Sequence, residues 1–176
     1  FEHAQRLGIF LHLVLNEGEH QNLRELDNGK LGVERKLYYR ELIARFGHHL
    51  GLQWNISEEY NVERAKGLEP NEVVLFARYI QDVDPYNHPI TVHHAREPVD
   101  AISFMFGDPL FSSTSIQIGQ RRIDTIVEDL RQRTIDAGHP LPICIDEYTV
   151  DANQTPLYQP VDDAQKHRKE KFWPAY

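Results

Sequence analysis

The sequence is poor in cysteine and lacks any apolar run that could span a membrane. Its single cysteine, Cys144, cannot form a disulfide within the chain, and its apolar surroundings favour a small buried side chain. The longest apolar stretch, residues 7–15, is interrupted by His12 and falls short of the roughly 18 residues that a membrane span needs. We therefore expect no membrane partner, and cysteine usage does not indicate a compartment.

Basic residues are also scarce relative to acidic ones. The chain has 19 Lys and Arg against 27 Asp and Glu, which gives a formal net charge of -8. A nucleic-acid partner requires a basic surface that neutralises phosphates, so this balance argues against one. The negative net charge is compatible with a neutral or cationic ligand, and it also keeps a protein soluble without any role in binding.

Apolar periodicity predicts strands that alternate with helices. The spacing of Tyr39, Leu42, Ile43 and Phe46 places them on one helical face, and similar spacing recurs further along. The predicted strands are residues 8–14, 50–56, 89–93, 113–118 and 143–146. The predicted helices are residues 34–46, 70–81 and 121–137, with the start of another at 162–172. A long polar loop, residues 16–32 with an Asp27-Asn28-Gly29 turn, separates the first strand from the first helix.

Strands alternating with helices indicate an α/β fold with a parallel sheet covered by helices. We favour a (β/α)8 barrel over an open doubly wound sheet. The doubly wound fold usually has a glycine-rich phosphate turn after its first strand. Here the residues after Val14 are Asn-Glu-Gly-Glu-His, whose two carboxylates would repel a phosphate.

Polar side chains gather at the expected carboxyl ends of the strands, where parallel α/β barrels place their functional groups. They are Asn16, Glu17, Glu58, Glu59, His93, His94, Gln117, Asp146, Glu147 and Tyr148. Paired carboxylates suit cleavage of a glycosidic bond, because one protonates the leaving oxygen while the other attacks the anomeric carbon or activates water. Aromatic rings such as Trp54 could stack on a sugar.

Each of these residues also has a structural interpretation. A Glu after a strand is commonly a solvated loop charge, and Trp54 inside an apolar strand is commonly core. His48 and His49 lie between a helix and a strand, so we expect them to be structural. A zinc site built from His12, His93 and a carboxylate is an alternative, although adjacent histidines on a strand point to opposite faces.

Two short motifs resemble clan A glycoside hydrolases. Residues 54–59, Trp-Asn-Ile-Ser-Glu-Glu, resemble the end of the fourth strand in that clan, which implies that Glu59 is the acid/base. Glu58 stands where the clan usually has Asn, and it is the rival for that role. Residues 141–148, Leu-Pro-Ile-Cys-Ile-Asp-Glu-Tyr, resemble the seventh strand, which implies that Glu147 is the nucleophile. Strand alternation predicts that Asp146 points away from the site.

A longer resemblance covers nearly the whole chain. Residues 8–13, 35–49 and 84–90 look like a bacterial family of secreted or periplasmic proteins, in which a β-rich domain precedes an apiosidase-like catalytic barrel. The resemblance implies that residues 1–176 are strands three to seven of a (β/α)8 barrel, and that the remainder of the same polypeptide completes it. Glu59 and Asn61 fall on functional positions of that family, which favours Glu59 over Glu58.

The function expected from these observations is hydrolysis of O-glycosidic bonds in a poly- or oligosaccharide by a retaining mechanism without a cofactor. Glu59 and Glu147 would be catalytic. The predicted substrate-binding residues are Glu17, Glu58, Asn61, His93, Gln117 and Tyr148. The alternatives are a carbohydrate-binding barrel that has lost catalysis, and a metal-dependent hydrolase that uses His12 and His93.

Overall fold

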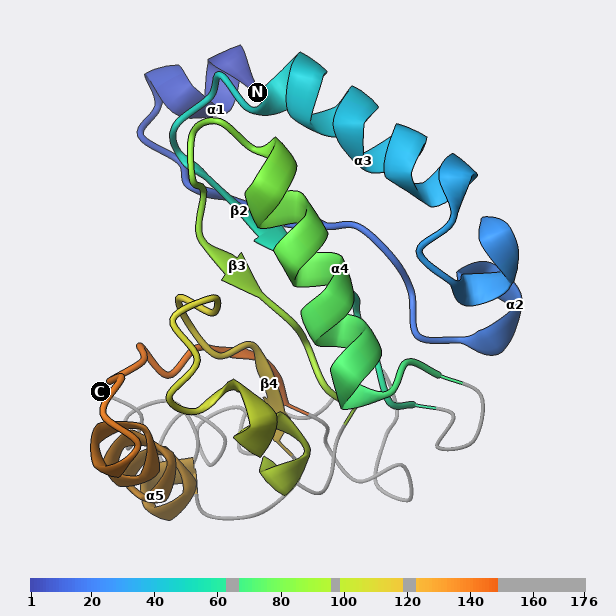
Figure 1. Ribbon diagram of the computed structural model, residues 1–176. Helices are drawn as coiled ribbons and strands as arrows, with labels where there is room; N and C mark the ends of the chain where they lie inside the picture. Colours follow the sequence, from blue (N-terminus) through green and yellow to red (C-terminus); the bar gives the residue numbers. More distant parts are fainter. Residues whose placement is uncertain (63–66, 96–98, 119–122, 149–176) are drawn as a thin grey trace, which may run out of the picture.

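The computed structural model describes residues 1–62, 67–95, 99–118 and 123–148, and in these ranges helices and strands alternate (Figure 1). The strands are β1 (Leu11–Val14), β2 (Leu52–Asn55), β3 (Ile90–Thr91), β4 (Ile116–Ile118) and β5 (Ile145–Tyr148). The α-helices are α1 (Glu2–Arg6), α2 (His20–Leu23), α3 (Val33–Phe46), α4 (Pro70–Val83) and α5 (Ile123–Asp136). Two 3-10 helices, η1 (Asp27–Gly29) and η2 (Val99–Met105), lie in the connections.

The strands pair in parallel and in the order in which they occur along the chain. One sheet has the order β1-β2-β3, and a second has β4-β5. A parallel bridge between His93 and Ser115 continues the pairing from the end of β3 to the start of β4. The backbone N–H of Ser112 also donates to the carbonyl of Ile90 at 2.9 Å. The described strands therefore follow one another side by side without a reversal of order.

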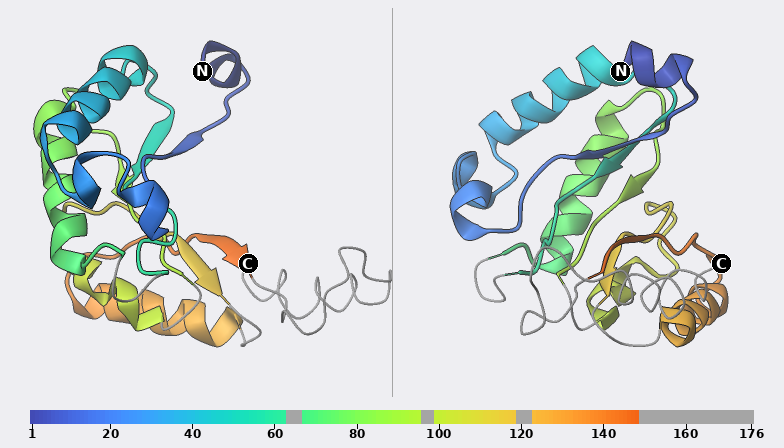
Figure 2. Two further views of the ribbon diagram at one scale, coloured as in Figure 1. Left: turned by 90° about the vertical axis from the view of Figure 1, so that its right-hand side faces the viewer. Right: turned by 180° about the vertical axis from the view of Figure 1, so that it is seen from behind.

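Helix α4 illustrates how the sequence specifies the helical layer. Glu69 and Glu72 form a capping box at its start, and Pro70 occupies the first turn, where a missing N–H costs nothing. Its buried face follows the expected helical spacing: Val73, Phe76, Ala77 and Ile80. Figure 2 shows α3 and α4 together on one side of the first sheet, with α5 beside β4. None of the described helices is both long and apolar enough to cross a membrane.

Alternation along β2 separates an apolar face from a polar one. Trp54 is fully buried. Its side chain lines one small internal space together with Leu15, Tyr39, Ile43 and Ile80, so it faces α3 and α4. Its indole Nε1 donates to the buried carboxylate of Asp84 at 2.9 Å. The structural interpretation of Trp54 is therefore confirmed, and stacking on a sugar is not available to it.

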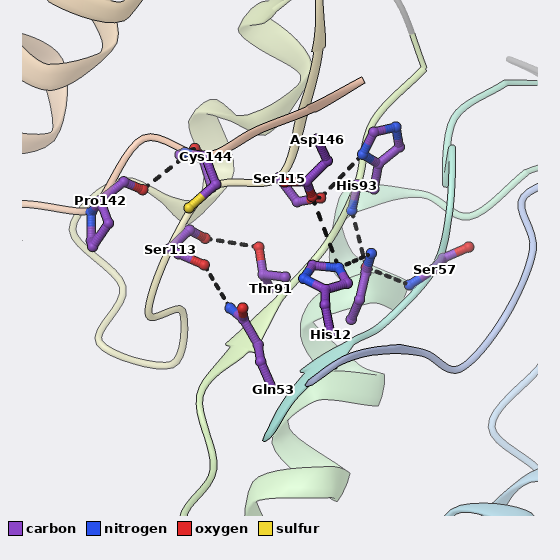
Figure 3. Close-up of polar contacts among 12 residues, drawn as sticks. His12, Gln53, Ser57, Thr91, His93, Ser113, Ser115, Pro142, Cys144 and Asp146 are labelled. Atoms are coloured by element: carbon purple, nitrogen blue, oxygen red, sulfur yellow. Dashed lines mark hydrogen bonds and ion pairs between the residues drawn. The ribbon is translucent and has the colours of Figure 1, made fainter. Parts of the chain in front are cut away.

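The residues on either side of Trp54 point the other way and make polar contacts with other segments of the chain. Gln53 Nε2 donates to Ser113 Oγ at 2.6 Å, and Thr91 Oγ1 donates to the Ser113 carbonyl at 2.8 Å (Figure 3). Asn55, two residues further along β2, contacts His12 of β1. The face opposite α3 and α4 thus carries buried polar side chains in hydrogen-bonded groups.

The predicted α/β class with a parallel sheet is confirmed, while several predicted boundaries differ. All five predicted strands are present. The first four are shorter than predicted, the first of them beginning at Leu11 rather than at residue 8, and the fifth lies two residues later than predicted. The predicted loop 16–32 contains α2 and η1, and α1 and η2 were not predicted. The described strands form two small sheets and do not close into a barrel. The helix predicted at 162–172 lies outside the described residues.

Candidate active site

A cavity of about 430 Å³ opens at the carboxyl ends of the strands. Its lining comes from β1, β2, β5 and the segments that follow β2 and β3: His12, Val14, Asn55, Glu58, His93, Asp146 and Glu147. Glu58 and Glu147, which belong to the two motifs singled out in the sequence, therefore face the same space. Three of the seven lining residues are carboxylates, so the cavity wall is rich in hydrogen-bond acceptors.

A second, larger cavity of about 740 Å³ adjoins the first. It is lined by Val14, Leu15, Asn16, Glu17, Asn22, Glu25, Leu26, Arg35, Tyr38 and Glu58. Val14 and Glu58 belong to both linings, so the two hollows meet at Glu58. Each volume is in the range of small-molecule sites, and Glu58 lies at their junction.

The wall of this second cavity depends on the buried guanidinium of Arg35. Its Nε donates to the carbonyl of Lys30 at 3.1 Å, and Nη2 donates to the carbonyls of Leu23 and Leu26 at 2.6 and 3.0 Å. Its Nη1 donates to Asn16. Because these bonds occupy the guanidinium, Arg35 holds the segment after β1 in place and does not offer a free cation to an anionic ligand.

The backbone positions Glu58 by pairing the segment after β2 with the segment after β1. The N–H of Glu58 donates to the Asn16 carbonyl at 2.9 Å, and Glu58 forms a parallel bridge with Glu17. Gly18 allows this close approach, since a Cβ at that position would lie 1.9 Å from the carbonyl oxygen of Glu59. Only glycine fits there without displacing the turn that carries Glu58 and Glu59.

The environment of Glu58 favours its protonated form. Burial raises the pKa of its carboxyl above the usual value, and neighbouring carboxylates raise it further. In decreasing order of effect, these are Glu59, Glu147, Glu17 and Glu19. A carboxyl group whose pKa is raised holds its proton to higher pH, which suits it to donate that proton in a reaction.

Glu59 lies next to this cavity in sequence but is not among its lining residues. It is half-buried, its backbone has a φ of 35°, and its carbonyl accepts from Val62 N at 2.8 Å in a tight turn. The positive φ redirects the chain immediately after Glu58. Its charge nevertheless acts on Glu58, so the two carboxyl groups belong to one acidic cluster.

Glu147 and Asp146 both line the cavity, although they are consecutive residues of β5. The pairing of β4 with β5 explains this: Ile116 is opposite Ile145 and Gln117 is opposite Glu147, so Asp146 is an extra residue in an irregular register. Such a bulge breaks the alternation of side chains. The expectation that Asp146 points away from the site is therefore wrong.

His93 is 4% exposed and takes part in a polar network that crosses three strands. Its Nδ1 lies 3.1 Å from Ser115 Oγ, and Ser115 Oγ donates to Asp146 Oδ2 (Figure 3). Its backbone N–H donates to Asn55 Oδ1 at 3.1 Å. Burial lowers the pKa of His93, an effect that Asp146 and Glu147 oppose and His12 reinforces. The neutral imidazole is consequently favoured.

The other predicted substrate-binding residues have different surroundings. Glu17 is exposed, lines the second cavity and accepts from Asn22 Nδ2. Asn61 uses its Oδ1 to accept from Ala95 N at 2.8 Å, which holds the segment after β3. Gln117 is buried in β4 opposite Glu147. The backbone of Tyr148 ends β5, and its side chain lies outside the described residues.

The histidines do not form a metal centre within the described ranges, where no three His, Cys, Asp or Glu side chains come together as ligands. Asn55 Oδ1 accepts from the backbone N–H of Ser57 and His93, so its Nδ2 donates to His12 Nε2 at 2.8 Å. That nitrogen of His12 is thereby occupied. The predicted structural role of His49 is supported by its burial and by a 3.0 Å contact with Gln5.

Sequence reasoning missed two residues of this site, Asn55 and Ser115. Asn55 orients both His12 and the His93 backbone, and Ser115 joins His93 to Asp146. Alternation along β2 could have found Asn55, because its neighbours Trp54 and Ile56 are apolar. Ser115 has no comparable signal in the sequence.

Solved structures of other proteins resemble this fold. The chain is similar to a crystal structure of a proposed glycoside hydrolase from Bacteroides vulgatus, with a TM-score of 0.60 and 23% sequence identity. The match covers 81% of this chain and 26% of that one, so the chain spans about a quarter of the length of its neighbour. No protein-family model matches, and no curated protein matches. The likeness shows a shared α/β fold.

Proposed function

We propose that the chain forms part of a glycoside hydrolase that cleaves O-glycosidic bonds of a poly- or oligosaccharide with two carboxyl groups. The observation that carries the proposal is that Glu58 and Glu147, from different strands, line one cavity at the carboxyl ends of a parallel sheet. The raised pKa of Glu58 beside other carboxylates fits the same chemistry. A structural neighbour that is a proposed glycoside hydrolase is in accord with this activity.

The barrel is also part of this proposal. Five parallel strands in sequential order, with helices between them, match an arc of a (β/α)8 barrel better than a doubly wound sheet, whose order reverses. In the proposal, residues 1–176 supply this arc and the rest of the polypeptide completes it. A secreted or periplasmic location suits an enzyme that acts on polysaccharides.

In the proposed mechanism Glu147 attacks the anomeric carbon while the acid protonates the departing oxygen. The bond from the anomeric carbon to the leaving oxygen breaks, and an ester between the sugar and Glu147 forms. The same acid, now ionised, takes a proton from water, whose oxygen attacks the anomeric carbon and releases the sugar from Glu147. The configuration is retained after two inversions.

The adjacent glutamates offer two choices for the acid. The resemblance to clan A motifs implies Glu59, whereas the cavity lining and the raised pKa favour Glu58. We propose Glu58 as the proton donor, with Glu59 as the neighbouring charge that helps to keep Glu58 protonated. The alternative function, carbohydrate binding without hydrolysis, needs neither group to exchange a proton.

The test uses the full polypeptide and aryl glycosides of common sugars, followed by plant and algal polysaccharides. Glu147→Gly should abolish hydrolysis, and added azide should restore turnover by attacking from the face that the carboxylate leaves open. The product should then be a glycosyl azide of inverted configuration. Sugar binding without turnover by the unmodified protein would favour the non-catalytic alternative. Hydrolysis that survives Glu147→Gly would remove Glu147 from the mechanism.

A further inference from the structure

The carboxylate of Asp146 determines how hydrogen atoms are arranged around His93. An ionised carboxylate can only accept, so the hydroxyl of Ser115 must donate to Asp146 Oδ2. The single hydroxyl hydrogen of Ser115 is then used, and its oxygen can only accept from His93. Because His93 Nδ1 lies 3.1 Å from Ser115 Oγ, Nδ1 must carry the proton of the imidazole.

A neutral His93 with its proton on Nδ1 has a bare Nε2, which is an acceptor. Burial favours the neutral ring by lowering its pKa. His93 Nε2 is one of two buried side-chain polar atoms in the described ranges that have no hydrogen-bond partner, the other being Nε2 of His94. His93 lines the cavity that also contains Glu58 and Glu147, whereas His94 is not among the lining residues.

We propose that His93 Nε2 accepts a hydrogen bond from a hydroxyl group of the bound ligand, and that Ser115 and Asp146 are positioning residues that fix it as an acceptor. The inference rests on the proposed function for the identity of the ligand, a carbohydrate. It adds a defined role for His93 Nε2, as a hydrogen-bond acceptor, and assigns to Ser115 and Asp146 the maintenance of that role.

The same geometry indicates which ligands the cavity selects. The carboxylates of Glu147 and Asp146 and the bare Nε2 of His93 are all acceptors, so the ligand must supply donors. A neutral, hydroxyl-rich sugar provides them, and a sugar carboxylate or sulfate would place acceptor against acceptor. Leaving a buried acceptor unpaired is costly, so a ligand that lacks the matching hydroxyl is selected against.

The experiment reads the two ring nitrogens directly. The full polypeptide is labelled with ring-15N histidine, and its one- and two-bond 1H–15N correlations are recorded with and without high millimolar D-glucose, D-galactose, D-mannose, D-xylose or L-rhamnose. His93 should show a protonated Nδ1 and a bare Nε2. At least one sugar should move Nε2 of His93 toward the hydrogen-bonded range. His94 is the internal control, since its Nε2 should not move.

Two variants separate the acceptor from its support. Ser115→Ala should leave the fold intact but let His93 populate both tautomers, which moves the two nitrogen resonances toward each other. His93→Asn places an amide near the position of Nδ1 and removes the acceptor at Nε2. It should weaken binding of the responsive sugar by roughly two- to tenfold, the value of one neutral hydrogen bond.

The outcomes distinguish this proposal from the proposed function. A proton on Nε2 of His93 in the free protein overturns the inference, and so does an Nε2 resonance that none of the sugars moves. If the polypeptide hydrolyses glycosides while Nε2 stays unmoved, the function holds and the inference fails. If the Nε2 resonance responds to a sugar but no glycoside is hydrolysed, the inference holds and the proposed catalytic function is refuted.

Discussion

Replacing Glu58 by Gln should make the protein more stable at neutral pH and, at the same time, inactive. The pKa of Glu58 is raised above the usual 4.5 in the folded protein by burial and by neighbouring carboxylates. The folded state thus binds this proton more tightly than the unfolded chain does. Its stabilising contribution is complete below the unfolded pKa and is lost as the pH rises through the folded pKa. Above that pH the ionised carboxylate destabilises the fold.

The size of the gain follows from the exposure of the side chain. Glu58 is only half-buried, so solvent screens its repulsion by Glu59, Glu147, Glu17 and Glu19. We expect Glu58→Gln to raise the free energy of unfolding by about 0.5 to 1 kcal/mol at pH 7. The difference should vanish at about pH 4, where the native carboxyl group is protonated as well.

Thermal unfolding of the full polypeptide at several pH values measures this difference, with Glu59→Gln as the matched control. Hydrolysis by Glu58→Gln should fall by roughly 10² to 10⁴, which is typical for loss of a general acid. Glu59→Gln should keep more activity and should move the alkaline limb of the pH profile to lower pH, because it removes a charge that raises the pKa of Glu58. The reasoning is refuted if Glu58→Gln is less stable than the parent at pH 7, or if Glu59→Gln is the variant that loses catalysis.

Three further substitutions test the scaffold around the site. Trp54→Phe removes the indole N–H that donates to the buried carboxylate of Asp84, so thermal denaturation should show a loss of about 1 to 3 kcal/mol. Gly18→Ala places a Cβ 1.9 Å from the carbonyl oxygen of Glu59, so the turn that carries the proposed acid must move. Hydrolysis assays should therefore show a marked loss of activity, while thermal unfolding shows only a small shift of the midpoint. Arg35→Lys cannot reproduce the several N–H donors by which the guanidinium binds three backbone carbonyls. The free energy of unfolding measured in urea should fall by about 2 kcal/mol or more, and limited proteolysis should cut the segment after β1 faster.

The long helices and the order of the strands could be predicted because their signals are local. Helix α4 has a capping box, a proline in its first turn and an apolar stripe, and all three lie within fourteen residues. Helix α2, by contrast, has four residues and is too short to show a helical period. It forms where Arg35, twelve positions after Leu23, binds the carbonyl at its end. Contacts of that kind are not visible in a window of sequence.

The candidate site was predictable to the level of its segments and not to the level of its atoms. The motifs indicated that the chain after β2 and the chain of β5 contribute carboxylates to one place, and Glu58 and Glu147 line one cavity. The motifs did not indicate that Glu58, rather than Glu59, would line the cavity, because this depends on the positive φ of Glu59 and on the approach of Gly18. Both are properties of the packed turn.

The bulge in β5 explains how one strand serves two purposes in the proposed site. In a regular strand, alternation would direct either Asp146 or Glu147 into the cavity, and the other would face the helical layer. The extra residue lets both face inward, since Glu147 remains opposite Gln117 while Asp146 reaches Ser115. In the proposal, Glu147 is then available to the reaction, and Asp146 fixes the tautomer of His93. Removing Asp146 by deletion would restore alternation and detach His93 from its support, so the bulge couples the proposed nucleophile to the proposed hydroxyl acceptor.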